Sequence, residues 1–520
     1  MATTLYVAAT YIALFFIPLC FLVASYRLLF HPLHRYPGPF FAKVTEGYGG
    51  WFAIRKRLHL ETYRNFQKYG PVVRQAPNRL VFNTATALHD IYLNPRVTKG
   101  KAYRASQMRA KYPSMINAID SNQHRRKKKY ISPVMGDRSM RIFEPTMSSQ
   151  IDIFLRLLLE SSRNSSYVDM TQRCQRLGVD IVTLLAFGYR INTQTDETSR
   201  FLPALIDNFS WRISTYMQFP ALKPLEHLLI LSTLGRAVKF ANMVKSMIKT
   251  RMAQDKDAHH DLYSVVAGHL GKRQVGLYNG ELWPEAILFI MAGGTTTATA
   301  MSALFFYLAR NPTAYARLTA EIRSTFASGR PDTICSGSQL HSCKYLRACI
   351  DEAMRMSPPV ITPIEEPFII DGHVIPRGTQ VAVSLYSLFH NEEYFPDSFA
   401  FKPEHWLEEA GGEGDDSSST SRESMRKVFA PFILGDRSCA GRLMAYQEAS
   451  LTVARTLWYF DFELAPGKAG EVGGGTPGRA DGRHRAGEFQ LEDIMVTGHT
   501  GPNLVFRLRG EFWKELELKG

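Results

Sequence analysis

One cysteine in a glycine-flanked loop is the group in this chain best suited to do chemistry. The run reads Phe432-Ile-Leu-Gly435-Asp-Arg437-Ser-Cys439-Ala-Gly441. A thiolate bound to haem iron donates electron density through the metal and favours O–O cleavage on the opposite face. Glycines allow the backbone to approach a flat ring closely, because they carry no Cβ. The residue types around Cys439 therefore predict the axial-ligand loop of a haem-thiolate site.

Neighbours of Cys439 are predicted to serve the same site. Phe432 can shield the sulfur from water, and the planar fork of Arg437 can reach a haem propionate. A helix expected from about Gly441 to Trp458 would point its N-terminal dipole at Cys439 and lower the pKa of the thiol. The alternative is a buried core thiol in a turn.

This ten-residue pattern resembles the ligand signature of the cytochrome P-450 family of haem-thiolate monooxygenases. The resemblance implies a mainly α fold with a small β part, in one large domain. It implies haem b, an iron protoporphyrin IX ligated by the thiolate of Cys439, as cofactor. It also implies insertion of one oxygen atom from O2 into a hydrophobic small molecule, with electrons passed from NADPH by a separate flavoprotein reductase.

The apolar run 286–307 predicts a long buried helix with Pro284 in its first turn. Residues 292–297 read AGGTTT, and glycine and threonine are poor helix formers. Threonine hydroxyls that compete for backbone carbonyls, beside glycines, can open a groove for oxygen and water. The alternative is close packing of small residues against a neighbouring helix. The resembled family has an acid followed by threonine here, so Thr296 keeps the alcohol and Thr295 replaces the acid; both are candidate catalytic residues for proton delivery.

Two motifs are expected to support the haem loop. Glu352 and Arg355 form an ExxR pattern on a helix predicted over residues 345–356. In isolation this pattern is typical of a surface ion pair; the resemblance implies a buried pair behind the haem loop. His405 stands where the family usually has an arginine that completes this network, so we expect a weakened or pH-dependent third member.

The basic run 124–129 reads HRRKKK. A nuclear-localisation or phosphate-binding patch is one interpretation. Its position instead resembles the family helix that holds a haem propionate, with His124 and Lys128 on one helical face. The remaining basic residues are then expected to point outward, toward an acidic flavoprotein donor: Arg125, Arg126 and Lys129.

The first residues predict a membrane anchor at 5–29, followed by a catalytic domain at 30–520. The anchor carries no charge before Arg27, is long enough to span a bilayer, and is followed by basic residues that place the large domain in the cytoplasm. A cleaved signal peptide is the alternative. A net charge of +14 fits an anionic membrane surface and an acidic electron donor. The sequence has no basic stripe interleaved with aromatics, which is the pattern that would indicate nucleic-acid binding. The resemblance implies the endoplasmic reticulum as the location.

Two low-complexity stretches, 408–426 and 467–487, are predicted to be solvated loop insertions. The second contains a formal GxGxxG at 473–478, but Pro477 and the lack of a preceding strand argue against a dinucleotide site. Six cysteines occur without zinc-like spacing, and five of them are expected to be reduced, buried thiols.

The substrate is predicted to be an apolar, membrane-delivered molecule, because the segments that resemble family substrate contacts are rich in aromatic and aliphatic side chains. The N-terminal segments look like those of fungal microsomal members in secondary metabolism, which implies terpenoid, polyketide or alkaloid tailoring. A redox-neutral haem-thiolate isomerase or dehydratase, favoured by Thr295, and a non-catalytic membrane-anchored haem-binding scaffold stay open as alternatives. The expected contact segments are 99–123, 201–229, 288–292, 360–363 and 495–499.

Overall fold

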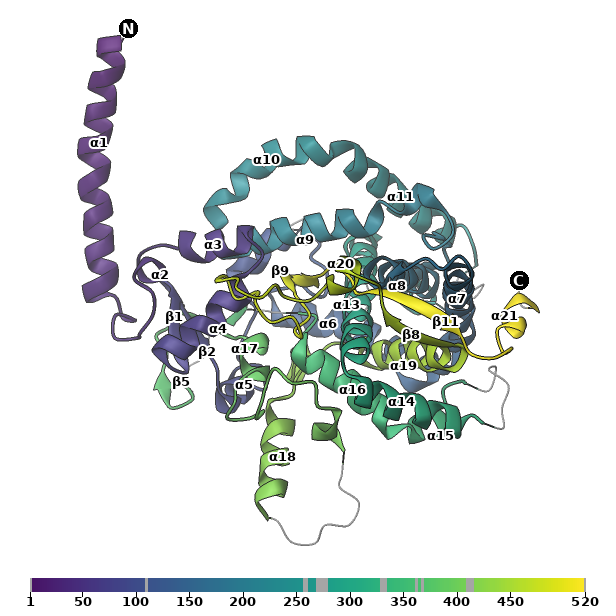
Figure 1. Cartoon of the computed structure of the whole chain (residues 1–520). Coiled ribbons are helices and arrows are strands. Elements are labelled where there is room, and N and C mark those ends of the chain that lie inside the picture. Colours follow the sequence, from purple (N-terminus) through teal and green to yellow (C-terminus); the bar gives the residue numbers. More distant parts are fainter. Residues whose placement is uncertain are drawn as a thin grey trace.

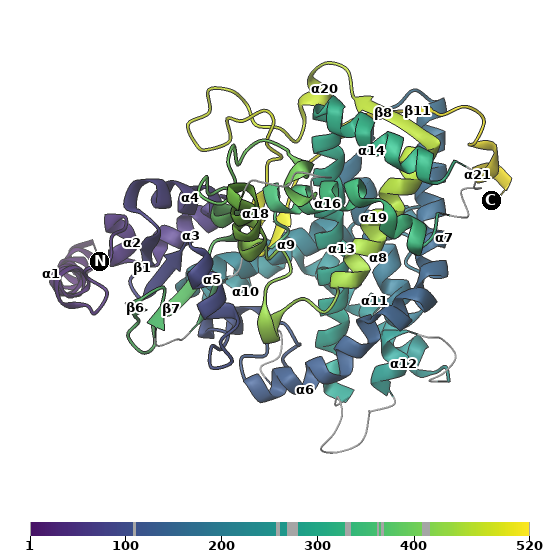
Figure 2. The same cartoon turned by 90° about the horizontal axis from the view of Figure 1, so that it is seen from below.

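The computed structural model describes residues 2–107, 111–255, 261–267, 279–327, 334–360, 363–365, 369–407 and 416–518. Most of these residues are helical, and the strands form small separate sheets, which confirms the predicted fold class. Figure 1 shows the helices gathered into one body, with α10 and α11 arching over α9. Figure 2 shows the N-terminal β region on one side of that helical body.

The longest helices carry the hydrophobic core. Residues of α7, α8, α13, α16 and α19 form one continuous buried cluster. Amphipathic and wholly apolar faces pack here because burial of apolar surface is the main driving force of folding. The helices of eight or more residues are α1 Ala2–Ser25, α3 Gly47–Ile54, α4 Leu58–Tyr69, α5 Ala85–Tyr92, α6 Ser121–Ile131, α7 Asp137–Arg163, α8 Met170–Phe187, α9 Leu202–Gln218, α11 Leu234–Met252, α13 Asn279–Arg310, α14 Pro312–Thr325, α16 Lys344–Met356, α18 Asp416–Val428 and α19 Arg442–Tyr459.

Shorter helices connect these elements. They lie at turns between the long helices and strands, and α17 lies directly after a strand of the largest sheet. They are α2 Phe40–Val44, α10 Glu226–Leu229, α12 Leu262–Ala267, α15 Ser338–Ser342, α17 Leu385–Phe389, α20 Lys468–Glu471 and α21 Lys514–Leu518.

The largest sheet has the strand order β1-β2-β7-β4. Strands β1 and β2 pair antiparallel, β2 and β7 pair parallel, and β7 and β4 pair antiparallel. Smaller sheets are β3-β11-β8 and the hairpins β9-β10 and β5-β6. The strands are β1 Val72–Ala76, β2 Arg79–Phe82, β3 Val168–Asp169, β4 Pro363–Glu365, β5 Ile369–Ile370, β6 His373–Val374, β7 Gln380–Val383, β8 Phe460–Leu464, β9 Glu492–Ile494, β10 Val496–Gly498 and β11 Asn503–Leu508.

Helix α1 stands away from the body of the protein (Figure 1). Its apolar side chains are exposed, with Phe15 at 66% and Phe21 at 72%. Among the described residues only the helical segment Gly280–Arg310 is long and apolar enough to cross a membrane. Of its most apolar stretch 72% is buried inside the protein, as in a core helix. Leu14–Phe30 is a shorter apolar helix. The membrane anchor at 5–29 therefore stays a prediction.

Parts of both predicted loop insertions are ordered by local bonds. Residues 416–428 form α18 instead of a loop, because Met425 and Val428 are buried and Glu423 pairs with Lys427 at 2.9 Å. Within 467–487 the backbone N–H of Gly475 donates to Arg485 O at 2.9 Å, which closes a turn. The GxGxxG run is thus part of that turn.

Two smaller expectations were also wrong. Helix α13 begins at Asn279, so Pro284 lies inside the helix and not in its first turn. Three of the five non-ligand cysteines are buried, but Cys20 and Cys335 are exposed; all are free thiols.

Candidate active site

The loop between α18 and α19 holds Cys439 by backbone hydrogen bonds. The N–H of Cys439 donates to Phe432 O at 2.9 Å, and the N–H of Ser438 donates to Gly435 O at 3.1 Å. Ile433 adopts a φ of 58°, an unusual conformation for a β-branched residue. Such strain costs about 1–3 kcal/mol and clusters at functional sites. The loop is therefore held in one specific shape around the sulfur.

The two glycines of the loop play different parts. Gly435 has a φ of 67°, and a Cβ there would overlap the carbonyl oxygen of Tyr92. Gly441 has an ordinary φ of −83°, and an added Cβ would meet only Cys439 Sγ, at 3.9 Å. Gly435 is thus required by the protein's own backbone, whereas the described protein atoms leave room for a Cβ at Gly441, so its role beside a bound ring stays a prediction.

The thiol of Cys439 has exposed surface but is surrounded by protein atoms at slightly longer range. Burial raises the pKa of Cys439, while the backbone N–H of Gly441 and the charge of Lys128 act in the opposite direction. The Gly441 N–H at the N-terminus of α19 thus lowers the pKa, as predicted for this helix end, although desolvation has the larger effect on the thiol. A metal-bound thiol is deprotonated outright, so the bound iron would supply the ionisation.

The predicted propionate-binding residues gather next to this loop. His124, Gly435 and Arg437 line one cavity of about 160 Å³. Arg437 Nη1 donates to Ala118 O at 3.0 Å, and Lys128 Nζ donates to Asp436 O at 2.6 Å. Burial lowers the pKa of His124 to about 3, so its ring is neutral. Cationic donors beside a thiol form a set that would hold an anionic haem, and Arg437 and Lys128 are the groups that would bind its propionates.

The basic run on α6 is less exposed than expected. Arg125 and Lys129 are exposed, as predicted. Arg126 instead forms an ion pair with Glu281 at 2.5 Å. Lys127 is fully buried and lies 2.8 Å from Glu285 on α13. The expectation that Arg126 points outward is thus wrong, because acidic side chains at the start of α13 draw this face of α6 inward.

The candidate threonines lie on α13 and bond to its own backbone. Thr295 Oγ1 donates to Met291 O at 2.7 Å, and Thr296 Oγ1 donates to Ala292 O at 2.6 Å. Thr295 is only 2% exposed, whereas Thr296 is half-buried. Of the two hydroxyls, that of Thr296 is therefore the more available to water and substrate.

The glycines before these threonines serve packing. A Cβ on Gly293 would lie 2.6 Å from Val182 Cγ2, and one on Gly294 would lie 2.8 Å from Val179 Cγ2. A Cβ on Gly178 of α8 would in turn lie 2.6 Å from Gly294 O. The glycines thus let α13 and α8 approach closely, which is the alternative that the sequence left open for this segment.

Thr299, near the candidate threonines, was not singled out from the sequence, although its partners Thr497 and His499 lie in the expected contact segment 495–499. Thr299 Oγ1 lies 3.0 Å from Thr295 O, 3.1 Å from Thr497 O and 3.3 Å from His499 Nδ1. Thr299 follows Thr295 by one helical turn, so the threonine-rich run was a usable signal. The partner on β10 is set by tertiary contact alone. Thr299 thereby ties the oxygen helix to the β9-β10 hairpin.

The ExxR pair is fully buried. Arg355 donates to Glu352 through Nε at 2.9 Å and Nη2 at 2.8 Å, a bidentate geometry. Its Nη1 also donates to Phe389 O and Ser398 O, both at 2.8 Å. Glu352 therefore orients an arginine that gathers two separate loop segments.

His405 lies in the network at the place that the resemblance implied. Its Nδ1 is 3.3 Å from Glu352 Oε1, and Trp406 Nε1 donates to Glu352 Oε2 at 3.0 Å. Burial alone would raise the pKa of Glu352, but the charge of Arg355 and the hydrogen bonds from His405 and Arg355 outweigh it and lower the pKa to about 2. Glu352 is thus ionised throughout the neutral range.

Glu448 on α19 is a buried acid that the sequence interpretation missed. Its side chain is 0% exposed, and neither carboxyl oxygen has a hydrogen-bond partner among the described residues. Burial raises its pKa to about 8. The sequence does contain a signal for it, because Glu448 is an acid among apolar residues of a predicted core helix. It lies nine residues after Cys439 and more than one turn from the start of that helix.

We expect Glu448→Gln to stabilise the protein at pH 7–8 and to have little effect at pH 5. Below the ordinary pKa of 4.5 the acid is neutral in both states. As the pH rises toward 8 the unfolded state ionises and the folded state does not, so stability falls by about 1.4 kcal/mol per pH unit, roughly 3 kcal/mol by pH 7. Urea unfolding at pH 5, 7 and 8 measures this, with exposed Glu463→Gln as control. A pH-independent difference would contradict it.

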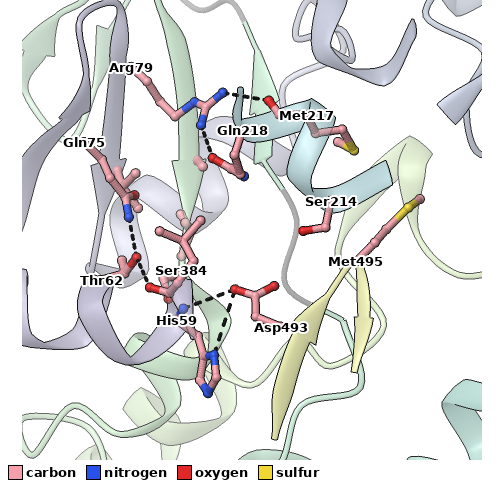
Figure 3. A pocket seen from close by; sticks show the side chains of 14 residues that line it. His59, Thr62, Gln75, Arg79, Ser214, Met217, Gln218, Ser384, Asp493 and Met495 are labelled. Atoms are coloured by element: carbon pink, nitrogen blue, oxygen red, sulfur yellow. Dashed lines mark hydrogen bonds and ion pairs between the residues drawn. The ribbon is translucent and has the colours of Figure 1, made fainter. Parts of the chain in front are cut away.

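Two of the expected substrate-contact segments meet at a second cavity, of about 50 Å³. Figure 3 shows Ser214 and Met217 of α9 beside Met495, which lies between β9 and β10. The expected segment 288–292 lies on α13. Residues 108–110 and 361–362 of two further segments lie outside the described residues.

Comparison with known proteins gives a consistent family. Residues 37–472 match the family model described as Cytochrome P-450. The cytochrome P-450 monooxygenase AKT7 of Alternaria alternata is 32% identical over 97% of this chain and 98% of that relative. The cytochrome P-450 monooxygenase poxM of Penicillium oxalicum is 33% identical, over 96% of this chain and 94% of its own length. The monooxygenase atnE of Emericella nidulans is 30% identical over 93% of each.

Proposed function

The chain belongs to the cytochrome P-450 family of haem-thiolate monooxygenases, and from that premise we propose that it oxidises an apolar small molecule in fungal secondary metabolism. Its relatives come from fungi and are named as monooxygenases. The single observation that carries the proposal is the Cys439 loop, with Arg437, Lys128 and His124 grouped beside it. The substrate class is inferred from the apolar side chains of the expected contact segments.

When bound, haem supplies the activation of O2 from which one oxygen atom is inserted. The chain's own residues hold that group and manage protons. Cys439, shielded by Phe432, would hold the iron, and Gly435 fixes the turn before it. Arg437 and Lys128 would bind the propionates, with the neutral His124 nearby.

Proton delivery is assigned to the hydroxyl of Thr296, because it is the less buried of the two candidates. Its Oγ1 holds a water and passes a proton, while the neighbouring Thr295 is buried and bonded to Met291 O. Because Thr295 stands where the family usually has an acid, this relay has one proton-carrying group fewer.

Electrons are proposed to come from NADPH through a separate flavoprotein reductase, which contacts exposed Arg125 and Lys129. The apolar helix α1 is proposed to anchor the protein in the endoplasmic reticulum membrane, with the catalytic domain in the cytoplasm. Charge attraction between the basic face of α6 and an acidic donor would speed the encounter and weaken with salt.

Isotope labelling tests the reaction type. Membranes that contain the full chain and a reductase are given NADPH, 18O2 and a panel of sesquiterpene, polyketide and indole alkaloid probes. One 18O atom in the product supports the proposal. Product formed without NADPH or O2 would support the alternative function, a redox-neutral isomerase, which is favoured by Thr295 at the usual acid position. Haem binding with no NADPH consumption on any probe would favour the scaffold.

We expect Thr296→Ala to uncouple the enzyme. NADPH is still consumed, but the ratio of hydrogen peroxide to product rises by about 100-fold, because positioned proton transfer contributes on the order of 10²–10⁴. Thr296→Ser, which keeps the hydroxyl, is the matched control and should stay coupled. Measured peroxide, product and NADPH give the ratio directly. An unchanged ratio in Thr296→Ala would remove this hydroxyl from the relay.

A further inference from the structure

An aromatic ring on α19 packs against the Cys439 loop. Tyr446 lies seven residues after Cys439 and is half-buried. The centre of its ring is 5.2 Å from that of Phe432, with an angle of 49° between the two planes. Aromatic rings with centres roughly 4.5–7 Å apart attract each other beyond the effect of burial alone. Tyr446 is therefore the neighbour of the side chain that is expected to shield the sulfur.

The hydroxyl of Tyr446 is fixed by a buried acid on another helix. Its O–H donates to Asp351 Oδ1 at 2.6 Å, and Asp351 is 8% exposed on α16. Helices α16 and α19 lie side by side (Figure 1, Figure 2). Burial raises the pKa of Tyr446, and the charge of Asp351 raises it further, so the phenol keeps its proton and donates. A short hydrogen bond to a carboxylate is of the stronger kind.

Arg347 holds the face of the same ring. Its guanidinium carbon lies 3.5 Å from the centre of the Tyr446 ring, and its Nε donates to Asp351 Oδ2 at 2.9 Å. Arg347 and Asp351 are four residues apart on α16, so both side chains lie on the same face of that helix. Tyr446 is thus held at its hydroxyl and at its ring face, and it can change position only if these contacts with α16 break.

The ring of Phe432 depends on this neighbour for its orientation. The carbonyl oxygen of Phe432 accepts the N–H of Cys439 at 2.9 Å, which fixes the backbone but leaves the side-chain torsions free. Phe432 is half-buried, and among the described residues Tyr446 is the one aromatic ring that packs against it. The chain of contacts from α16 through Tyr446 therefore decides where the Phe432 ring lies.

The position of that ring bears on the sulfur, because the apolar shell around a metal-bound thiolate controls access of water and the reduction potential. A water that donates a hydrogen bond to the sulfur withdraws electron density from it. Reduction adds negative charge, which nearby water stabilises. Both effects raise the reduction potential, and water at the sulfur also brings a proton that can neutralise it. A ring that keeps water away thus keeps the potential low and the thiolate intact.

We propose that Tyr446, Asp351 and Arg347 are positioning residues that hold the Phe432 ring beside the Cys439 sulfur and so exclude water from it. This rests on the proposed function, because it takes Cys439 as the ligand of the iron. The three residues act through Phe432 and take no direct part in the reaction.

Spectroelectrochemistry of the haem-loaded full chain in membranes tests the proposal. The readouts are the reduction potential and the rate at which the long-wavelength carbon-monoxide band converts to the band of a neutral ligand. Tyr446→Ala is expected to raise the potential and to speed this conversion about fivefold, as the loss of one aromatic pair implies. Tyr446→Phe keeps the ring without its anchor, so it should fall between Tyr446→Ala and wild type. It also gives the answer if Tyr446→Ala does not fold.

A second tyrosine of the chain makes the same kind of contacts elsewhere and serves as the matched control. Tyr315 on α14 donates to Asp461 Oδ1 at 3.1 Å, and Arg323 pairs with Asp461 at 2.7 Å. The ring of Tyr315 packs on Phe462 of β8. Tyr315→Ala and Tyr315→Phe should lower stability in urea as the Tyr446 variants do, but should leave the potential and the conversion rate at their wild-type values.

The outcomes separate this inference from the proposed function. A wild-type potential and conversion rate in both Tyr446 variants, or equal changes in the Tyr315 variants, would overturn the inference and leave the proposed function in place. A wild type that lacks the long-wavelength band would overturn the proposed function and the inference with it.

Discussion

Replacement of Cys439 by alanine is expected to abolish the thiolate spectrum and reduce product formation to background. The reduced, carbon-monoxide-bound wild type should show a Soret band at the long wavelength typical of thiolate ligation, because the fifth ligand sets the electronic character of the iron. Without the sulfur that band is lost, and with it the electron donation that favours O–O cleavage. The measurement is the difference spectrum of membranes, with haem content determined in parallel.

The chain supplies its own control for this experiment. Cys335 is an exposed free thiol that is distant from Cys439 in the sequence, and Cys335→Ala should keep the long-wavelength band. Cys439→Ser tests whether an oxygen ligand can replace sulfur, and it should retain the loop but not the band. A normal thiolate spectrum in Cys439→Ala would remove this residue from the iron and overturn the proposed site.

Replacement of Arg355 by leucine should destabilise the protein by about 3–5 kcal/mol, because it leaves the Glu352 carboxylate buried without its partner. Both side chains are fully buried, and Arg355 also binds the carbonyls of Phe389 and Ser398. Total stabilities of folded domains are about 5–15 kcal/mol, so a loss of this size should also lower haem incorporation. Urea unfolding and haem content per chain measure both effects.

An exposed pair with the same spacing gives the comparison. Lys514 and Glu511 are also separated by three residues and lie 2.7 Å apart, with both side chains more than half exposed. Glu511→Gln should cost less than about 1 kcal/mol, as surface pairs do. If Arg355→Leu cost no more than this control, the ExxR pair would have no special part in the fold.

Local motifs could be predicted from the sequence because their function depends on neighbours in the chain. The turn around Cys439 is one such case, since Gly435, Arg437 and the ligand lie within five residues. Helices α16 and α19 were predicted to within about one residue at each end, and α13 was predicted at its C-terminal end but begins earlier than expected. The same reasoning failed at α18, where burial of Met425 and Val428 outweighs a polar, serine-rich composition.

Other residues were given the wrong environment because their partners are distant in sequence. Arg126 meets Glu281, 155 positions away, and turns inward. Gly294 meets Val179 and serves helix packing, although its place in the sequence also suited an oxygen groove. The balance between burial and the α19 N-terminus at Cys439 also depends on atoms from several elements, which the direction of one helix dipole does not reveal.

The sequence by itself determined the family resemblance, the fold class and the order of the main helices, and it predicted the ligand cysteine, since each depends on short patterns of residue type and spacing. Only the tertiary structure decided that Glu448 is buried without a hydrogen-bond partner among the described residues, and which segments share a cavity, as α9 and the β9-β10 hairpin do. Burial and convergence are set by packing between elements far apart in the chain. The residue type alone does not tell whether a carboxyl lies on the surface or in the core, although its pKa and its possible ligands differ between these two places.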